Sequence, residues 1–219
     1  MEHDFWFERW KNQQLGFHLD QPNRHLVEHG GLLADGPTRV LVPLAGKSRD
    51  LTWLRAAGHE VVGVEFVEQA GIAFFEENGL DPAASRIGPH PVFRADGITM
   101  VLDDFFALDP ATLGRFGAIY DRAALVAIDP ARRPAYVQKL RALASDDARL
   151  LLVSFDHDIG TGPPFSLAFA ELQTLMAGLF TLEPLADLDL LPSEPRFRER
   201  GAKRVREQVW LGRAVAARR

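Results

Sequence analysis

The sequence predicts a doubly wound α/β fold with a mostly parallel sheet. From Arg39 onward, short apolar runs alternate with segments that have helical spacing. Such runs are typical of strands buried on both faces of a parallel sheet, and their alternation with helices is typical of βαβ units. The 219 residues contain no internal repeat and no low-complexity linker, so we expect one domain. Residues 1–35 are expected to form a helical lid and residues 36–219 the α/β core.

Two helices are expected ahead of the sheet, at Asp4–Gln14 and Pro22–Leu33, because both segments have apolar residues at helical spacing. The first four buried strands are expected at Val40–Leu44, Val61–Val64, Ala118–Tyr120 and Leu150–Val153. The helices between them are expected at Ser48–Ala57, Glu68–Asn78 and Arg132–Ala144.

Asp96-Gly97 is a strong turn signal. It predicts a hairpin of Val92–Ala95 and Thr99–Leu102, inserted ahead of the fourth main strand. A loop rich in glycine and proline follows the strand that ends at Val153. We then expect a helix at Leu167–Leu179, a strand near Leu182–Leu185 and a last strand at Arg206–Val215.

The composition argues against several classes of protein. The formal net charge is -5 and most basic residues are scattered, so nucleic acid is not an expected partner. The N-terminus is acidic and unlike a secretory signal, and no window approaches the ~20 apolar residues that span a bilayer, so we expect a cytoplasmic protein with no membrane partner. Cysteine is absent, which excludes disulfides, thiolate metal sites and a thiol nucleophile.

A candidate ligand site follows the first two strands. In open α/β sheets, ligands bind beyond the carboxyl ends of the strands, where the strand order reverses. Gly46, after the first strand, allows close approach of the backbone, and Glu65, after the second, is placed to accept hydrogen bonds from ribose hydroxyls. Alone, each would be interpreted as a turn glycine or a solvated strand end. Together they indicate an adenosine-type cofactor.

Two phosphate-binding motifs are excluded at this position. Gly46-Lys47-Ser48 resembles the end of a P-loop, but Leu41 stands five residues earlier, where that loop needs glycine. The fingerprint G-x-G-x-x-G also fails, because Pro43-Leu44-Ala45 occupies the place of its tight turn. Because neither motif is present, the site is not expected to bind a pyrophosphate. An adenosine-type cofactor without a pyrophosphate, S-adenosyl-L-methionine (AdoMet), is therefore favoured.

Five segments in register resemble successive signatures of the thiopurine S-methyltransferase family, and the resemblance runs from Trp6 to Trp210. The segments are Val42–Ser48, Gly58–Glu65, Asp104–Leu108, Asp121–Ile128 and Gly162–Ser166. Five matches in order are more specific than any single glycine motif. The resemblance implies the Rossmann-like fold of class I AdoMet-dependent methyltransferases, with seven strands, an antiparallel C-terminal strand and an N-terminal helical lid. It also implies a monomer.

The resemblance also implies which residues form the site, with Arg122 as the candidate catalytic residue. The expected cofactor-binding residues are Trp10, Leu44, Gly46, Glu65, Phe66, Asp104, Phe105 and Arg122. The expected substrate-binding residues are Phe17, Pro163, Phe165 and Arg196.

Each implied residue has a plausible physical role. Leu44 and Phe105 offer apolar surface to a flat base, with Asp104 beside it, and Glu65 takes the ribose hydroxyls. Arg122 is suited either to pair with the methionine carboxylate or to reach the acceptor.

The aromatic residues of the N-terminal segment are expected to close over the cofactor. We assign Trp10 and Phe17 to this lid, and we expect Trp6 to pack an amphipathic helix on the sheet. Lys47 and Arg49 are interpreted as solvated charges.

Methyl transfer from a sulfonium is an in-line displacement, so alignment of the two partners is the main requirement. Alignment supplies about 7 to 11 kcal/mol, and an acidic thiol then needs no strong base. We hypothesise that Arg122, with Arg196, stabilises the thiolate form of the acceptor.

No metal is expected. His18, His157, Asp156 and Asp158 have the chemistry of metal ligands, but their spacing fits no metal motif, and we interpret them as loop residues.

Three functions are compatible with these residues. The first is methyl transfer to an aromatic or heterocyclic thiol, with S-adenosyl-L-homocysteine as the second product. A second is a methyltransferase of the same fold that acts on selenium or tellurium oxyanions, a halide or small thiols. The resemblance does not separate the two, because acceptor specificity depends on Phe17, the Gly162–Phe165 loop and a weakly matching C-terminal segment. The third is a non-catalytic AdoMet sensor, which would be expected to lack Glu65 or Arg122.

Overall fold

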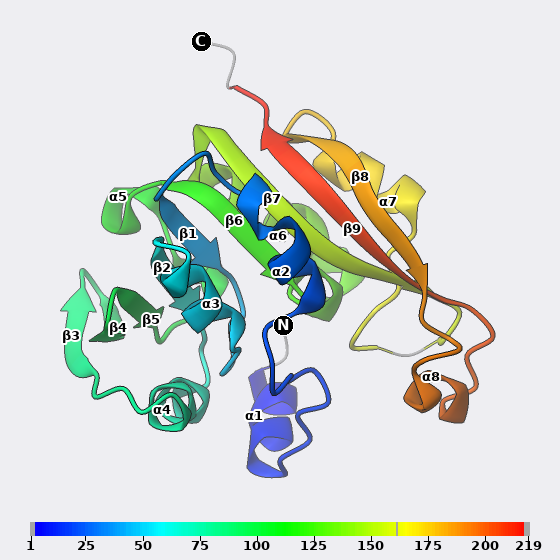
Figure 1. The fold of residues 1–219 in the computed structure, drawn as a ribbon, viewed down its shortest axis with the longest axis horizontal. Coiled ribbons are helices and arrows are strands. Elements are labelled where there is room, and N and C mark those ends of the chain that lie inside the picture. The colour runs from blue at the N-terminus through cyan, green and yellow to red at the C-terminus, as the bar shows by residue number, and fades with distance from the viewer. Residues whose placement is uncertain (1–2, 161, 217–219) are drawn as a thin grey trace.

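Nine strands form one sheet in the residues that this computed structural model describes, 3–160 and 162–216 (Figure 1). Their order across the sheet is β3-β4-β5-β2-β1-β6-β7-β9-β8. The strands are β1 (Arg39–Val42), β2 (Glu60–Val64), β3 (Ala83–Ile87), β4 (His90–Ala95), β5 (Ile98–Val101), β6 (Phe116–Arg122), β7 (Ala144–His157), β8 (Phe180–Asp189) and β9 (Val205–Ala214). The helices are α1 (His3–Lys11), α2 (Arg24–His29), α3 (Asp50–Ala56), α4 (Glu68–Glu77), α5 (Pro110–Leu113), α6 (Arg133–Leu143), α7 (Phe169–Met176) and α8 (Pro195–Glu199).

The centre of the sheet is parallel. β1 pairs in parallel with β2 on one side and with β6 on the other, while β5 extends the sheet beyond β2 and β7 extends it beyond β6. The chain builds one half first and then crosses to β6, so the strand order reverses between β1 and β6. Ligands of open α/β sheets bind beyond the carboxyl ends of the strands at such a point. The predicted doubly wound α/β fold is confirmed.

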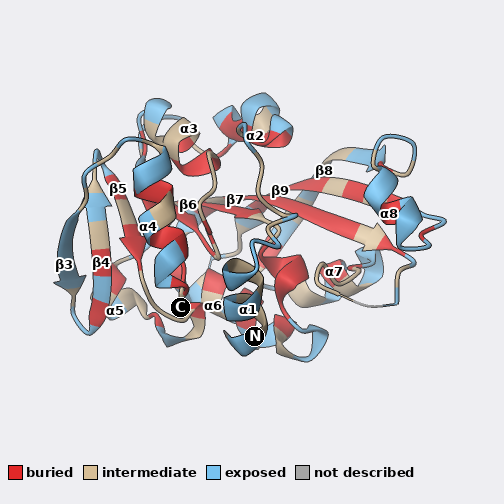
Figure 2. Ribbon diagram, turned by 90° about the horizontal axis from the view of Figure 1, so that it is seen from below, coloured by how far each residue is buried: buried red, intermediate tan, exposed pale blue. Residues whose placement is uncertain are grey.

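Helices cover both faces of this parallel centre because consecutive strand residues point to opposite faces. Val40 and Val42 pack in one apolar cluster with residues of α2, α3 and α4. Leu41 packs in the other cluster with residues of α6 and α7. Figure 2 shows that the central strands are largely buried. The two-sided burial explains the continuous apolar runs of the sequence.

The edges of the sheet differ from the expectation of seven strands. The predicted hairpin exists, but β5 pairs in parallel with β2 and so belongs to the central sheet instead of being an insertion. β4 and β3 then extend the sheet by antiparallel pairing. β3 was not predicted because it is largely exposed and has no apolar run (Figure 2). At the other edge, β9 pairs antiparallel with both β7 and β8, which confirms the antiparallel C-terminal strand.

The N-terminal segment divides into two parts with different surroundings. Leu26 of α2 and Leu33 are fully buried in the apolar cluster on the sheet. By contrast, α1 lies away from the sheet, beyond the ends of the central strands (Figure 1). Residues 1 and 2 of the acidic N-terminus lie outside the described residues. None of the described helices has the length and apolar character needed to cross a membrane.

Candidate functional site

A cavity of about 730 Å³, including its open mouth, lies at the carboxyl ends of β1, β2 and β6. α1 and the loop that follows it form the opposite wall. Its lining combines apolar, aromatic and charged side chains, a composition that suits a small polar ligand with an apolar part. The lining residues are Trp6, Trp10, Phe17, His18, Val42, Pro43, Leu44, Ala45, Lys47, Ser48, Asp50, Glu65, Phe66, Tyr120, Arg122, Ala123 and Ala127.

Two residues of the turn after β1 have positive φ angles. β1 ends at Val42, two residues earlier than predicted, because Leu44 has a φ of 48° and leaves the extended conformation. Gly46 has a φ of 54°, which glycine adopts at little cost. A Cβ atom at Gly46 would lie 3.4 Å from Cζ2 of Trp10, so the lid residue Trp10 packs close to the backbone of this turn.

Glu65 is fixed by the backbone of this turn. Its side chain is buried, with the residue only 6% exposed. Its Oε2 atom accepts a hydrogen bond of 3.0 Å from the amide of Gly46, and its Oε1 atom accepts one of 2.8 Å from the amide of Val67. Burial raises the pKa of Glu65 to about 7, although the hydrogen bonds from Val67 and Gly46 oppose this shift. A ligand that donates hydrogen bonds to Glu65 would favour its ionised form.

A second carboxylate, Asp50, contributes to the cavity wall through a buried hydrogen-bond network. Asp50 accepts a hydrogen bond of 2.7 Å from the amide of Asn23 and one of 3.1 Å from the hydroxyl of Tyr120. Burial and the charge of Asp50 raise the pKa of Tyr120 well above its usual value. The sequence analysis missed both residues, although an acid at the start of the helix after the Gly46 turn was a usable signal.

Arg122 lies at the end of β6 and reaches the N-terminal segment. Its Nη1 atom donates a hydrogen bond of 2.8 Å to the carbonyl oxygen of Phe17. The next residue, Ala123, has a φ of 64°, which is uncommon outside glycine. The strained turn changes the direction of the chain directly after the guanidinium-bearing residue. Arg122 therefore connects the central sheet to the loop that follows α1.

A second cavity, of about 1190 Å³ with its open mouth, adjoins the first. Five residues line both cavities: Trp6, Phe17, Arg122, Ala123 and Ala127. The other residues that line the second cavity are Arg9, Gly16, Phe155, Gly162, Pro163, Pro164, Arg196, Phe197 and Arg200.

The second cavity is rich in guanidinium groups and aromatic rings. Arg9, Arg122, Arg196 and Arg200 line it, and no carboxylate occurs among its described lining residues. Arg196 donates a hydrogen bond of 2.7 Å to the carbonyl oxygen of Gly16, so it also contacts the loop after α1. The excess of positive charge beside aromatic surface favours an aromatic or anionic ligand.

The sequence profile of the family described as thiopurine S-methyltransferase (TPMT) matches residues 1–214. The chain belongs to the thiopurine S-methyltransferase family. A thiopurine S-methyltransferase of Pseudomonas paraeruginosa is 42% identical over 214 residues, covering 96% of this chain and 98% of that protein. A thiopurine S-methyltransferase of Nitrosospira multiformis is 39% identical over 214 residues, covering 96% and 97%. The predictions of the family, of a methyltransferase and of AdoMet as the cofactor are confirmed.

Solved structures of lower identity agree in fold. The 1,6-didemethyltoxoflavin-N1-methyltransferase of Burkholderia thailandensis, solved with S-adenosylhomocysteine, has a TM-score of 0.64 at 20% identity and covers 97% of this chain and 86% of that one. TehB of Haemophilus influenzae has a TM-score of 0.59 at 15% identity and covers 96% and 67%. Both similarities support the class I methyltransferase fold.

Most of the site residues that the family resemblance implied line one of the two cavities. In the first cavity these are Trp10, Leu44, Glu65, Phe66 and Arg122. In the second they are Arg122, Pro163 and Arg196, and Phe17 lines both. Gly46 contributes its amide to Glu65. The family resemblance implied these positions, and the fold brings them to the carboxyl ends of the central strands.

Besides Gly46, three of the implied residues do not line either cavity. Phe105 is 1% exposed, and its ring centroid lies 4.9 Å from that of Tyr136 in the core. The side chain of Asp104 caps a short helix by accepting a hydrogen bond from the amide of Phe106. The side chains of Asp104 and Phe105 are therefore engaged in local structure. The backbone of Phe165 is fixed by hydrogen bonds with Val126 and Arg133.

Trp6 and Lys47 have surroundings that differ from those expected from the sequence. Trp6, expected to pack on the sheet, lines both cavities, because α1 stands away from the sheet. Lys47, expected to be a solvated charge, lines the first cavity and forms an ion pair of 2.5 Å with Glu77. The turn at Gly46 directs Lys47 toward α4, which the spacing alone did not indicate.

Arg9 and Arg200 are further cavity residues that the sequence analysis missed. They lie on α1 and directly after α8, almost the whole chain apart. A short basic and aromatic segment around 196–200 was the available signal, but nothing in it pointed to the carboxyl end of the sheet.

Proposed function

We propose that this enzyme transfers the methyl group of AdoMet to the sulfur of an aromatic or heterocyclic thiol. The observation that carries the proposal is the pair of adjoining cavities, which share Arg122 and Phe17. One cavity has the buried carboxylate of Glu65, and the other has four arginines beside aromatic rings. The acceptor sulfur and the methyl donor would meet at the shared wall. We further propose that residues 1–219 form one methyltransferase domain.

The first cavity fits the cofactor by its chemistry. Glu65 is an acceptor for the ribose hydroxyls, and Leu44 gives apolar surface beside it. Gly46 has no side chain, so the rings of Trp10 and Phe17 lie close to its backbone at the edge of this cavity. Asp104 and Phe105 follow β5, the neighbour of β2, and we retain them as candidates for the adenine end. When bound, AdoMet supplies an activated methyl group, and S-adenosyl-L-homocysteine remains after transfer.

The second cavity is proposed to bind and orient the acceptor. Arg122 and Arg196 place positive charge where a thiolate would lie, and a nearby cation lowers the pKa of a thiol. Phe17 and Pro163 give apolar surface for the ring of the acceptor. Correct orientation supplies about 7 to 11 kcal/mol in reactions of this type, so the residues need to align the thiolate rather than to deprotonate it.

The loop that carries Phe17 is proposed to act as the lid. Arg122 donates to the carbonyl oxygen of Phe17 and Arg196 to that of Gly16, so two acceptor-site arginines hold consecutive residues of this loop. The lid would comprise α1 and the loop after it, because α2 already packs on the sheet.

The direct test is methyl transfer from labelled AdoMet to 6-mercaptopurine, with selenite, tellurite and a simple alkyl thiol in parallel. We expect rapid methylation of the aromatic thiol. Preference for another acceptor would overturn the proposed substrate class while leaving the cofactor assignment intact.

A second candidate acceptor class is an oxyanion of selenium or tellurium, or a small thiol. The four arginines of the second cavity favour it, since guanidinium groups bind oxyanions in bidentate fashion. The aromatic residues of the same cavity favour the thiol. The acceptor comparison described above separates the two.

We also propose a cytoplasmic monomer whose partner is the small-molecule acceptor, without nucleic acid or membrane. The family resemblance supports the monomer. Light scattering of the protein as it elutes from a size-exclusion column tests the monomer. A measured mass of twice 24.4 kDa would contradict this proposal.

AdoMet affinity is expected to rise with pH through about 7, the pKa of Glu65 in the free protein. Ribose hydroxyls donate to the ionised carboxylate, so binding below this pH must first remove a proton. At pH 6, one unit below this pKa, only about one tenth of Glu65 is ionised, whereas at pH 8 nearly all of it is. We therefore expect the affinity for AdoMet to be about 10-fold weaker at pH 6 than at pH 8. Calorimetric titration at several pH values measures this.

The Glu65→Gln variant is the control for that pH dependence. It keeps the size of the side chain but has no proton to lose, so its AdoMet affinity is expected to vary little between pH 6 and 8. The same slope in the variant and in the wild type would assign the titration to another group.

A further inference from the structure

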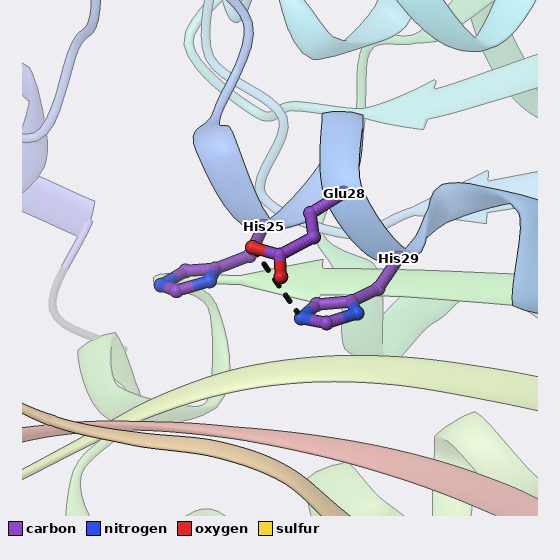
Figure 3. Close-up of side chains that lie close together, drawn as sticks. All are labelled: His25, Glu28 and His29. Carbon is purple, nitrogen blue, oxygen red and sulfur yellow. Dashed lines mark ion pairs between the residues drawn. The ribbon is translucent and has the colours of Figure 1, made fainter.

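Three side chains with metal-ligand chemistry meet on one face of α2. His25, Glu28 and His29 are spaced i, i+3 and i+4, which places them together on a helix. Figure 3 shows the carboxylate of Glu28 between the imidazole rings of His25 and His29, and one ligand atom of each residue lies within 4.8 Å of the others. The three residues are absent from the lining of both cavities. The cluster is thus separate from the methyl-transfer site.

Two ring nitrogens of this cluster are buried and have no hydrogen-bond partner among the described residues. These atoms are Nδ1 of His25 and Nε2 of His29. Nε2 of His29 lies 3.8 Å from Oε2 of Glu28, which is too far for a hydrogen bond. Buried polar atoms without partners are rare and costly, so two adjacent ones need a physical reason.

The contact with Glu207 of β9 determines which ring nitrogen of His25 is free to bind a ligand. Nε2 of His25 lies 2.8 Å from Oε2 of Glu207. A carboxylate only accepts hydrogen bonds, so Nε2 carries the proton and Nδ1 has the lone pair. Nε of Arg24 lies 3.3 Å from the same nitrogen and would donate to it only in the other tautomer, while Nη2 of Arg24 donates to Glu207 at 2.5 Å. The shorter contact of Nε2 with the carboxylate favours the tautomer with the proton on Nε2.

The contact of 2.8 Å between His25 and Glu207 supports this arrangement. A histidine that donates one ring N–H to a carboxylate and directs its other nitrogen at an ion is the usual arrangement at metal sites.

We propose that His25, Glu28 and His29 bind a zinc-type divalent cation, with Glu207 orienting His25. Two imidazoles and a carboxylate are common zinc ligands, and two histidines four residues apart are the usual helical pair. A fourth position is left for water. Because the 2.0–2.2 Å bonds of a tetrahedral ion place ligand atoms about 3.4 Å apart, the side chains must approach slightly. Glu28, whose side chain is 68% exposed, is free to rotate inward.

The ion would stabilise α2, because all three of its ligands belong to this helix. Glu207 of β9 bonds to His25, so the occupied site would be connected to the sheet through this imidazole. Asn23, which caps α2, also donates to Asp50 of the first cavity. The cation is therefore structural, and it lies close to the end of the lid loop. The expectation of no metal was based on His18, His157, Asp156 and Asp158 and did not include His25 and His29, which are four residues apart.

The test is zinc titration of the full chain, without an affinity tag and after removal of metal with a chelator. We expect calorimetry to find one Zn²⁺ per chain, and we expect Co²⁺ to give the visible d–d absorption of a tetrahedral site. Zinc is also expected to raise the melting temperature, because it binds the folded form.

Variants separate this site from adventitious binding. His29→Ala and Glu28→Gln are expected to abolish or strongly weaken binding and the cobalt absorption. Glu207→Gln is expected to weaken zinc binding about 10- to 100-fold without changing the stoichiometry, as loss of a supporting carboxylate does. Glu76→Gln, an exposed glutamate of α4, and His59→Asn, a histidine distant in sequence, are matched controls that should retain full affinity.

Circular dichroism checks the fold of each variant. If His29→Ala fails to fold, the exposed Glu28 still provides a test. Absence of zinc binding to the wild type, or binding that survives in both His29→Ala and Glu28→Gln, would refute the site. AdoMet affinity measured in the same variants is expected to stay within a few-fold of wild type, so failure of this proposal is distinct from failure of the proposed function.

Discussion

The Glu65→Ala variant is expected to bind AdoMet about 100-fold more weakly than the wild type and to lose most methyl transfer. Hydrogen bonds to a charged group contribute about 1.5 to 3 kcal/mol each, and two ribose hydroxyls would lose their acceptor. A loss of about 3 kcal/mol corresponds to about 100-fold in affinity. The amides of Gly46 and Val67 also lose the carboxylate that fixes the turn. Calorimetric titration with AdoMet at pH 8 measures the effect.

The control for this experiment is Glu76→Ala, which removes an exposed glutamate from α4. It should leave AdoMet affinity and activity unchanged. Thermal unfolding of both variants shows whether the Glu65 substitution acts through the site or through the fold. If a folded Glu65→Ala protein bound AdoMet within a few-fold of wild type, the ribose assignment would be wrong.

The Arg122→Ala variant is expected to lower kcat/KM for the thiol about 100-fold. Removing one preorganised donor from an active site typically reduces the rate by about 10²- to 10³-fold. The rise of the rate with pH should also move to higher pH, because the acceptor thiol loses a cation that lowers its pKa. The measurement is a pH-rate profile with 6-mercaptopurine, together with AdoMet affinity.

Two comparisons define what Arg122 does. Arg122→Lys retains a charge and should restore part of the rate, whereas Arg94→Ala, at an exposed position on β4, should behave as wild type. An unchanged pH-rate profile with normal AdoMet affinity would exclude thiolate stabilisation. A loss confined to AdoMet affinity would instead assign Arg122 to the carboxylate of the cofactor.

Burial explains how far the fold could be predicted. The runs Val40–Leu44, Val61–Val64 and Leu150–Val153 were recognised because strands covered on both faces need apolar residues at every position. β3 has no such requirement, because most of its residues are exposed at the edge of the sheet. Its sequence, AASRI, therefore has no strand signal, and only pairing with β4 makes it a strand.

The cofactor end of the site was predictable for a related reason. Gly46 lies shortly after β1 and Glu65 lies directly after β2, so their meeting follows from the pairing of these adjacent parallel strands. The family resemblance also named Trp10 and Leu44, which line the first cavity. It did not reveal that the ring of Phe105 is buried against Tyr136, because a motif gives residue identity and not side-chain direction.

The sequence by itself determined the fold class, the family and the meeting of Gly46 with Glu65, because each depends on local patterns or on neighbouring strands. The tertiary structure alone decided the second cavity and the support of His25 by Glu207. Arg9 and Arg200 line one cavity, and His25 meets Glu207, only after the chain has folded. Contacts between residues about 180 positions apart leave no periodic signal in a single sequence, because their geometry is set by the packing of all the elements between them.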